Sequence, residues 1–184
     1  MSMTQREIEL ARELVGYMDH GSIERAIYLD NAGKEVESRS VGSEREIKTQ
    51  IQRDVVKVVL HSHTLPDGSL STEDITTAIV HHLEKIIAVF KNHAFVASEF
   101  ISEDPADWEE ADRIIEKTKV EIAEDNGILS SCVPQTERES IGIAWFDNLP
   151  DTDKILYNHR FNQRIAAAGF FKYEVVTLFP SCYS

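Results

Sequence analysis

The chain has 184 residues, of which 42% are hydrophobic and 28% are charged, and its formal net charge is −13. This composition supports a buried core and excludes a chain that is disordered throughout. An acidic protein repels the phosphate backbone, so nucleic acid is an unfavourable partner.

Membrane insertion and cysteine chemistry are also unsupported by the sequence. No apolar run approaches the roughly 20 residues that cross a bilayer, and the polar first residues do not form the apolar segment of a signal peptide. We therefore expect a cytoplasmic protein without a membrane partner. The two cysteines, Cys132 and Cys182, stand far apart and outside any CxxC pair, which argues against a disulfide framework or a cysteine zinc site.

Hydrophobic periodicity predicts a helix and then three strands in the first part of the chain. The helix begins at a capping-box pattern, Thr4 followed by Glu7, and ends near Gly21. The segments predicted next are a strand over 23–30, a turn at 31–33, a second hairpin strand over 34–40, a short strand or ordered loop over 47–53, and a strand over 55–60. The last of these is an almost continuous apolar run, which is typical of a strand buried on both faces.

The rest of the chain continues to alternate between helices and strands. A loop containing Pro66, Asp67 and Gly68 leads to a helix that is predicted from an N-cap at Ser71 or Thr72 through Phe90. The segments predicted after it are a strand over 94–101, a helix from 104 to about 126, a loop over 132–140, a strand over 141–146, a helix over 151–168 and a strand over 171–179. This interleaving indicates an α/β or α+β fold with three layers, helix, sheet and helix. We expect a single domain over 1–184 with an additional C-terminal part from about residue 102.

The pattern with the clearest chemistry follows the buried strand. His61 and His63 are two positions apart, and side chains alternate along a strand, so both rings point to the same side. Asp74 follows three positions after Ser71, which places it in the first turn of the predicted helix if Ser71 is the N-cap. Two imidazoles and one carboxylate suit Zn²⁺ and leave its fourth position for water, as a catalytic zinc requires.

The run HSHTLPDGSLSTED, residues 61–74, resembles the motif of the JAB/MPN (JAMM) zinc metalloproteases, in particular the prokaryotic type. The motif reads His-x-His, a loop, and then Ser-x-x-Asp. The family usually has proline after the second histidine, where this chain has Thr64, so the loop geometry departs from the family pattern. The resemblance covers about the first half of the chain. Residues 102–184 match no known pattern, and we hypothesise that they recognise the substrate.

The resemblance implies a fold, a cofactor and a reaction. The fold would be a JAB/MPN domain with a sheet like that of cytidine deaminases and flanking helices. The metal would be Zn²⁺ on His61, His63 and Asp74. A glutamate on an upstream strand would be the general base, for which Glu24 is preferred and Glu13 is the rival. Ser71 would donate a hydrogen bond to the oxyanion. The expected activity is that of a peptidase or isopeptidase acting at the C-terminus of a ubiquitin-like protein.

Other interpretations of the same residues remain open. The two histidines could be ordinary polar residues at a strand end, and Ser71 and Asp74 could simply cap a helix. Some proteins of this fold lose the metal and act as scaffolds, which would make the chain a binding module. A RadC-like role linked to DNA is a third alternative, which the residues Ser62, Thr64 and Leu65 and the acidic charge disfavour.

Overall fold

The structure is a computed structural model that describes residues 2–18, 24–36, 40–41, 51, 55–63, 69–100, 105–130 and 132–179. The chain divides into two compact units. Met1–Phe100 together with Phe171–Ser184 forms the first, which we call the sheet unit. Ile101–Phe170 forms the second, which we call the helical unit. Each unit is described separately below.

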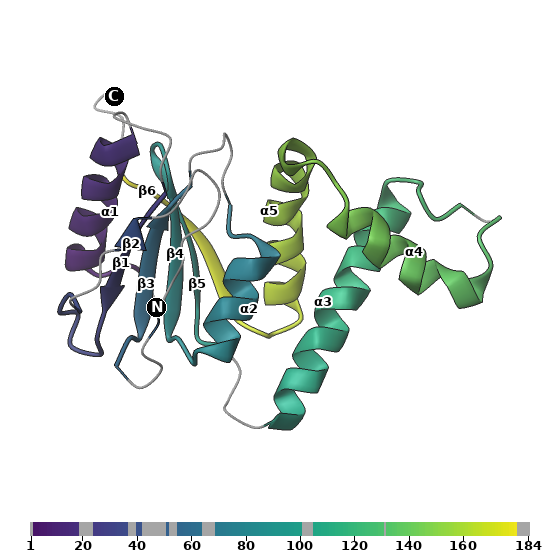
Figure 1. Ribbon diagram of the computed structural model, residues 1–184, viewed down its shortest axis with the longest axis horizontal. Helices are drawn as coiled ribbons and strands as arrows, with labels where there is room; N and C mark the ends of the chain where they lie inside the picture. Colours follow the sequence, from purple (N-terminus) through teal and green to yellow (C-terminus); the bar gives the residue numbers. More distant parts are fainter. Residues whose placement is uncertain are drawn as a thin grey trace. The chain divides into compact units, whose positions relative to one another are not determined.

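The sheet unit contains a six-stranded mixed sheet in the order β2-β1-β3-β4-β5-β6 (Figure 1). Its strands are β1 (Arg25–Leu29), β2 (Ser40–Val41), β3 (Val58–Ser62), β4 (Lys85–Phe90), β5 (His93–Ser98) and β6 (Lys172–Thr177). The central strands β3 and β4 are parallel, and the other pairs are antiparallel. The fold is therefore mixed α/β, as the alternation of elements predicts.

Two helices cover the two faces of this sheet (Figure 1). Helix α1 (Gln5–Met18) packs against β3 and β4 on one face, and α2 (Thr72–Val80) packs against β4 on the other. Every residue of β3 and β4 is buried, because both faces of these strands are covered. The core beneath α1 consists of alternate strand residues and apolar residues of the helix: Leu10, Ala11, Leu14, Ile27, Leu29, Val58, Leu60, Ile87 and Val89. The arrangement agrees with the expected three layers.

The predicted capping box of the first helix is confirmed. The Thr4 N–H donates to Glu7 Oε2 at 2.7 Å, and the Glu7 N–H donates to Thr4 Oγ1 at 3.2 Å. Glu7 also accepts from Lys85 Nζ at 2.8 and 3.0 Å, and both side chains are buried. Buried charges require such partners, so this pair fixes the start of α1 against the first residue of β4.

The helix predicted from Ser71 through Phe90 is too long. Helix α2 ends at Val80, and His82 has a φ of 51°, a left-handed conformation that no helix interior contains. The residues after Leu83 form β4, which pairs in parallel with β3. The apolar residues of this stretch recur at helical spacing, but they belong to a continuous buried run. Such a run fits a central strand equally well.

The helical unit contains α3 (Pro105–Asp125), α4 (Gln135–Asp147) and α5 (Asp151–Ala167). The strand predicted over 141–146 is wrong, because these residues lie within α4, and the loop predicted over 132–140 holds the start of that helix. Gly142 explains the helix packing: a Cβ there would lie 3.0 Å from Val120 Cα of α3. The absence of a side chain lets the two helices approach closely.

The helical unit is inserted between two paired strands of the sheet unit. Ser98, the last residue of β5, pairs with Lys172, the first residue of β6. Beyond this pair the rings of Phe100 and Phe171 lie 5.5 Å apart between centroids. The predicted strand over 171–179 is thus confirmed as β6, and it belongs to the sheet rather than to the inserted residues.

Several features predicted from the sequence lie on residues that the structure does not describe. The loop at 64–68 and most of the segment 47–53 lie outside them, and Ile51 is in neither a helix nor a strand. Cys182 also lies outside them, and Cys132 is exposed and unpaired. Among the helices within the described ranges, none is both long and apolar enough to cross a membrane.

Candidate metal centre

His61 and His63 project from the end of β3 toward the face of the sheet that carries α2. His61 pairs with Ala26 of β1 and with Ala88 of β4, which place its side chain on the face opposite the core beneath α1. His63 follows the strand directly, and its N–H donates to Val89 O at 3.0 Å, which keeps it in line with β4. The alternation of side chains therefore puts both rings on one face, as the spacing predicts.

The third residue comes from the first turn of α2. Ser71 is the N-cap, and its hydroxyl accepts from the Asp74 N–H at 3.1 Å. In return, Asp74 Oδ2 accepts from the Ser71 N–H at 2.7 Å and from its Oγ at 2.9 Å. This is a capping box, which satisfies otherwise unpaired backbone donors of the helix start. It also holds the Asp74 carboxylate so that Oδ1 faces His61 and Oδ2 faces His63.

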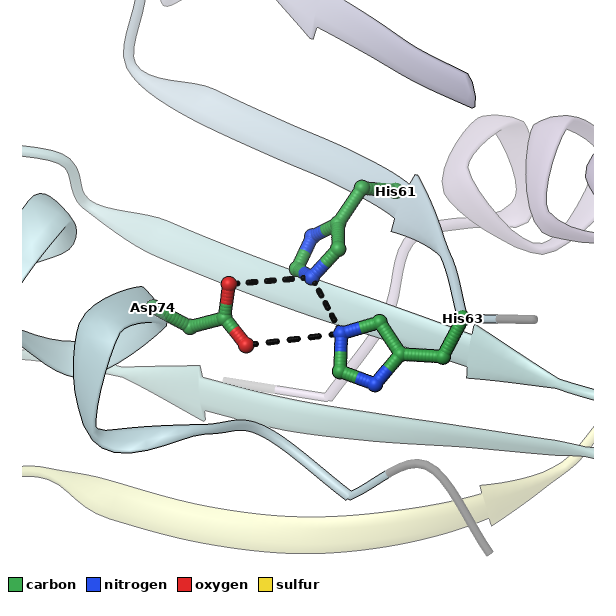
Figure 2. Close-up of side chains that lie close together, drawn as sticks. All are labelled: His61, His63 and Asp74. Atoms are coloured by element: carbon green, nitrogen blue, oxygen red, sulfur yellow. Dashed lines mark hydrogen bonds and ion pairs between the residues drawn. The ribbon is translucent and has the colours of Figure 1, made fainter. Parts of the chain in front are cut away.

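The three side chains converge (Figure 2). The two Nε2 atoms lie 2.8 Å apart, His61 Nε2 lies 3.1 Å from Asp74 Oδ1, and His63 Nε2 lies 3.4 Å from Asp74 Oδ2. A tetrahedral zinc with bonds of about 2.0–2.1 Å would hold its ligand atoms about 3.3 Å apart. The separations of 2.8–3.4 Å lie near this value, and these nitrogen and oxygen donors form a group of described residues that could hold a metal ion.

The charges at this centre are strongly coupled. Burial alone would lower the pKa of His61, but the charge and hydrogen bond of Asp74 and the charge of Glu24 outweigh it and raise the pKa above its ordinary value of 6.5. Burial would likewise raise the pKa of Asp74, but His61 and His63 hold it well below its ordinary value of 3.8.

Glu24 lies on the same side of the sheet as the histidines. It directly precedes β1, in which Ala26 pairs with His61, so alternation places Glu24 on the same face, next to His63. It is half-buried, and its charge contributes to the raised pKa of His61. Glu13 is exposed on α1, which covers the opposite face, and it accepts from the Tyr17 hydroxyl at 3.2 Å. The geometry brings Glu24, and not Glu13, to the metal centre.

Two supporting contacts were not predicted from the sequence. Ser62, between the histidines, accepts the Arg25 N–H on its Oγ at 2.9 Å. The Tyr173 hydroxyl of β6 lies 2.7 Å from Ser69 Oγ, two residues before the N-cap of α2. The second contact joins residues 104 positions apart, and local spacing carries no signal for such a pair.

Comparison of the chain with protein-family models, curated proteins and solved structures gave no match. The functional argument therefore rests on the motif and on the geometry of the centre.

Proposed function

We propose that the chain is a zinc-dependent hydrolase that cleaves an amide bond, as the JAB/MPN metalloproteases that its motif resembles do. The observation that carries the proposal is the convergence of His61, His63 and Asp74 on one face of the sheet, with Glu24 on the same face. Two ordinary polar histidines at a strand end would not require a carboxylate from the following helix to meet both rings, whereas a metal site does. The proposal includes a JAB/MPN-like fold for the sheet unit.

The residues of the chain divide the chemistry among them. When bound, zinc would acidify a water molecule and polarise the substrate carbonyl. Glu24 would accept the proton of the attacking water and later return it to the leaving amine. Ser71 would stabilise the oxyanion through its hydroxyl, but this hydroxyl now donates to Asp74 Oδ2. To stabilise an oxyanion, the Ser71 hydroxyl would therefore have to donate to the substrate instead of to Asp74. Its role as the N-cap of α2 requires no such change.

The substrate proposed from the resemblance is the C-terminus of a ubiquitin-like protein, or a conjugate of one. The side chains of the centre are accessible from one direction, since His63 and Asp74 are 16% and 18% exposed whereas His61 is 5% exposed. A carbonyl could therefore approach from the side of His63 and Asp74.

The first experiment is elemental analysis of the purified protein for zinc, iron, nickel and copper. We expect about one zinc per chain in the wild type and none in His61→Ala/His63→Ala. His93→Ala is the matched control, because His93 is an exposed histidine on the neighbouring β5, and it should retain the zinc. Absence of zinc after zinc is supplied at neutral pH would contradict the proposal and favour the metal-free scaffold. Iron in place of zinc would indicate redox chemistry, because iron oxygenases also use two histidines and a carboxylate.

The second experiment tests the base. Zinc-loaded wild type and Glu24→Gln would be incubated with a panel of ubiquitin-like proteins that carry C-terminal extensions. Loss of a general base typically slows turnover by about 10²–10⁴-fold, so we expect Glu24→Gln to retain zinc and lose most cleavage. Glu13→Gln should cleave at the wild-type rate. Equal cleavage by Glu24→Gln would assign the base elsewhere.

A further inference from the structure

The strand that follows the helical unit contacts the segment that carries the third metal ligand. Tyr173 of β6 pairs with Ala97, which pairs with Ile86, which pairs with Val59. Val59 lies two residues before His61 on β3, so Tyr173 projects from the same face of the sheet as the histidines. On that face its hydroxyl lies 2.7 Å from Ser69 Oγ, and either oxygen can donate.

The segment between this contact and the metal centre is short and tightly packed. Ser69 is 1% exposed and Leu70 is 0% exposed. Ser71 follows, and both its N–H and its hydroxyl donate to Asp74 Oδ2. These contacts therefore join Tyr173 to Ser69 and join Ser71 to the carboxylate of Asp74, and Leu70 is the one residue between Ser69 and Ser71 in the chain.

The hydroxyl of Tyr173 is not needed to keep β6 in the sheet. Backbone pairing joins β6 to β5 along the whole strand, from Ser98↔Lys172 to His93↔Thr177. The bond to Ser69 instead connects β6, at the edge of the sheet, to the segment that directly precedes α2. Its structural effect falls on the start of α2.

We infer that Tyr173 is a positioning residue of the metal centre: by holding Ser69, it fixes Ser71 and thereby sets Asp74 against His61 and His63. This inference rests on the proposed zinc site for its functional meaning, and on the Tyr173–Ser69 contact for its structure. Partners outside the ligand shell commonly orient metal ligands and tune affinity. The inference makes a residue outside the His-x-His motif, and beyond the helical unit, part of the zinc site.

Zinc affinity provides the first measurement, by competition with a chromophoric chelator on the full chain. We expect Tyr173→Phe and Ser69→Ala each to weaken binding by about three- to tenfold, the usual effect of one hydrogen bond. The double variant should lose no more than the larger single effect, because both remove the same bond. Tyr157→Phe is the matched control: its hydroxyl donates to Asn126 Oδ1 in the helical unit, and its removal should leave zinc affinity unchanged.

Hydrogen exchange of the metal-free proteins provides the second measurement and separates this inference from the proposed function. Tyr173→Phe and Ser69→Ala should speed exchange in a peptide spanning 69–80, and Tyr157→Phe should not. Faster exchange together with weaker zinc binding supports the inference. Unchanged zinc affinity in both variants, in a wild type that binds zinc, overturns it whatever the exchange shows. A wild type that binds no zinc overturns the proposed function, and faster exchange would then support only the structural half of the inference.

Discussion

Ser62 shows how a single residue inside the His-x-His motif serves the opposite face of the sheet. The histidines on either side of it point toward α2, so Ser62 points toward the face beneath α1, where it is 1% exposed. Its Oγ accepts the N–H of Arg25, and this N–H belongs to the peptide bond that follows Glu24. Ser62 therefore ties the segment carrying the proposed base to the strand carrying the two histidines.

Replacing Ser62 should destabilise the sheet unit. In Ser62→Ala the Arg25 N–H loses its acceptor, and an unsatisfied buried donor costs about 1–3 kcal/mol. Urea denaturation of the metal-free protein would measure the change in the free energy of unfolding. Ser98→Ala is the control, because Ser98 is also buried in a strand but no hydrogen bond from a backbone N–H to its Oγ is present among the described residues. An equal, small effect of both substitutions would contradict the assigned role.

The coupled pKa values of His61 and Asp74 predict a particular pH dependence for the metal-free protein. The raised pKa of His61 gives stability that is complete below its unfolded value of 6.5 and is lost as the pH rises through the folded value. The lowered pKa of Asp74 gives stability that is present above 3.8 and is lost as the pH falls through its folded value. Stability from this pair is therefore greatest between about pH 4 and pH 6.5.

Thermal unfolding at a series of pH values would check this expectation. Between pH 6.5 and 8.5 the metal-free wild type should lose more stability than Asp74→Asn, in which the charge of Glu24 remains but the larger contribution of Asp74 to a protonated His61 is gone. With zinc bound the trend should reverse, because the metal binds deprotonated ligands. Parallel curves for wild type and Asp74→Asn would show that the pair does not titrate as described.

Among the secondary-structure elements, two apolar stretches were assigned the wrong type from the sequence. A strand was predicted as part of a helix, and part of a helix was predicted as a strand. The apolar residues of 85–90 continue the helical spacing of the preceding segment. They nevertheless form β4, a central strand of the sheet between β3 and β5. Residues 141–146 contain β-branched and aromatic residues, yet they lie in α4 against α3. In both cases the tertiary position decided, and local propensity did not. The starts of helices with clear boundary signals, such as Thr4 with Glu7 and Ser71 with Asp74, were predicted correctly.

The close approach of α4 to α3 can be tested at Gly142. In Gly142→Ala the new Cβ would meet backbone at 3.0 Å, and such overpacking typically costs about 1–3 kcal/mol. Gly16→Ala in α1 has nothing within 4 Å of the new Cβ and should be neutral or stabilise by up to about 1 kcal/mol. Denaturation curves of both variants would check this. A neutral Gly142→Ala would argue against the helix pair.

Local sequence patterns predict the three proposed metal ligands, His61, His63 and Asp74. They do not predict the residues that support them. Strand alternation places His61 and His63, and the capping box places Asp74, so two neighbouring segments of sequence suffice. The position of Glu24 depends on the pairing of β1 with β3, whereas the predicted hairpin paired 23–30 only with 34–40. Tyr173 depends on the return of β6 to the sheet beyond a whole inserted unit, and no short-range rule predicts that contact.

For the molecule as a whole, the insertion of the helical unit between β5 and β6 means that the helices can be deleted either together with β6 or without it. Removing residues 102–184 would take away β6 with Tyr173 as well as the helical unit, so loss of activity would not identify the helices as the recognition part. Replacing residues 101–170 by a short Gly/Ser linker keeps β6. The linker need only span the gap between Phe100 and Phe171, whose rings are already in contact.

We expect the linker variant to fold and to bind zinc with wild-type affinity, because every described residue of the metal centre lies in the sheet unit. Truncation after residue 101 should unfold at a lower temperature and bind zinc more weakly. Circular dichroism and chelator competition would measure both. If the full chain binds the proposed ubiquitin-like substrate and the linker variant binds it equally well, the helical unit does not recognise it.

The same insertion bears on how the sheet forms. Pairing Ser98 with Lys172 closes a loop of about 70 residues, and loop-closure entropy rises by roughly 0.6 kcal/mol for each doubling of loop length. If the helices fold first and bring their two ends together, the effective loop shrinks to a few residues, and closure becomes easier by roughly 2–3 kcal/mol. Folding of the inserted helices would then govern the rate at which the edge strand joins the sheet, and the contact between Tyr173 and Ser69 would form late.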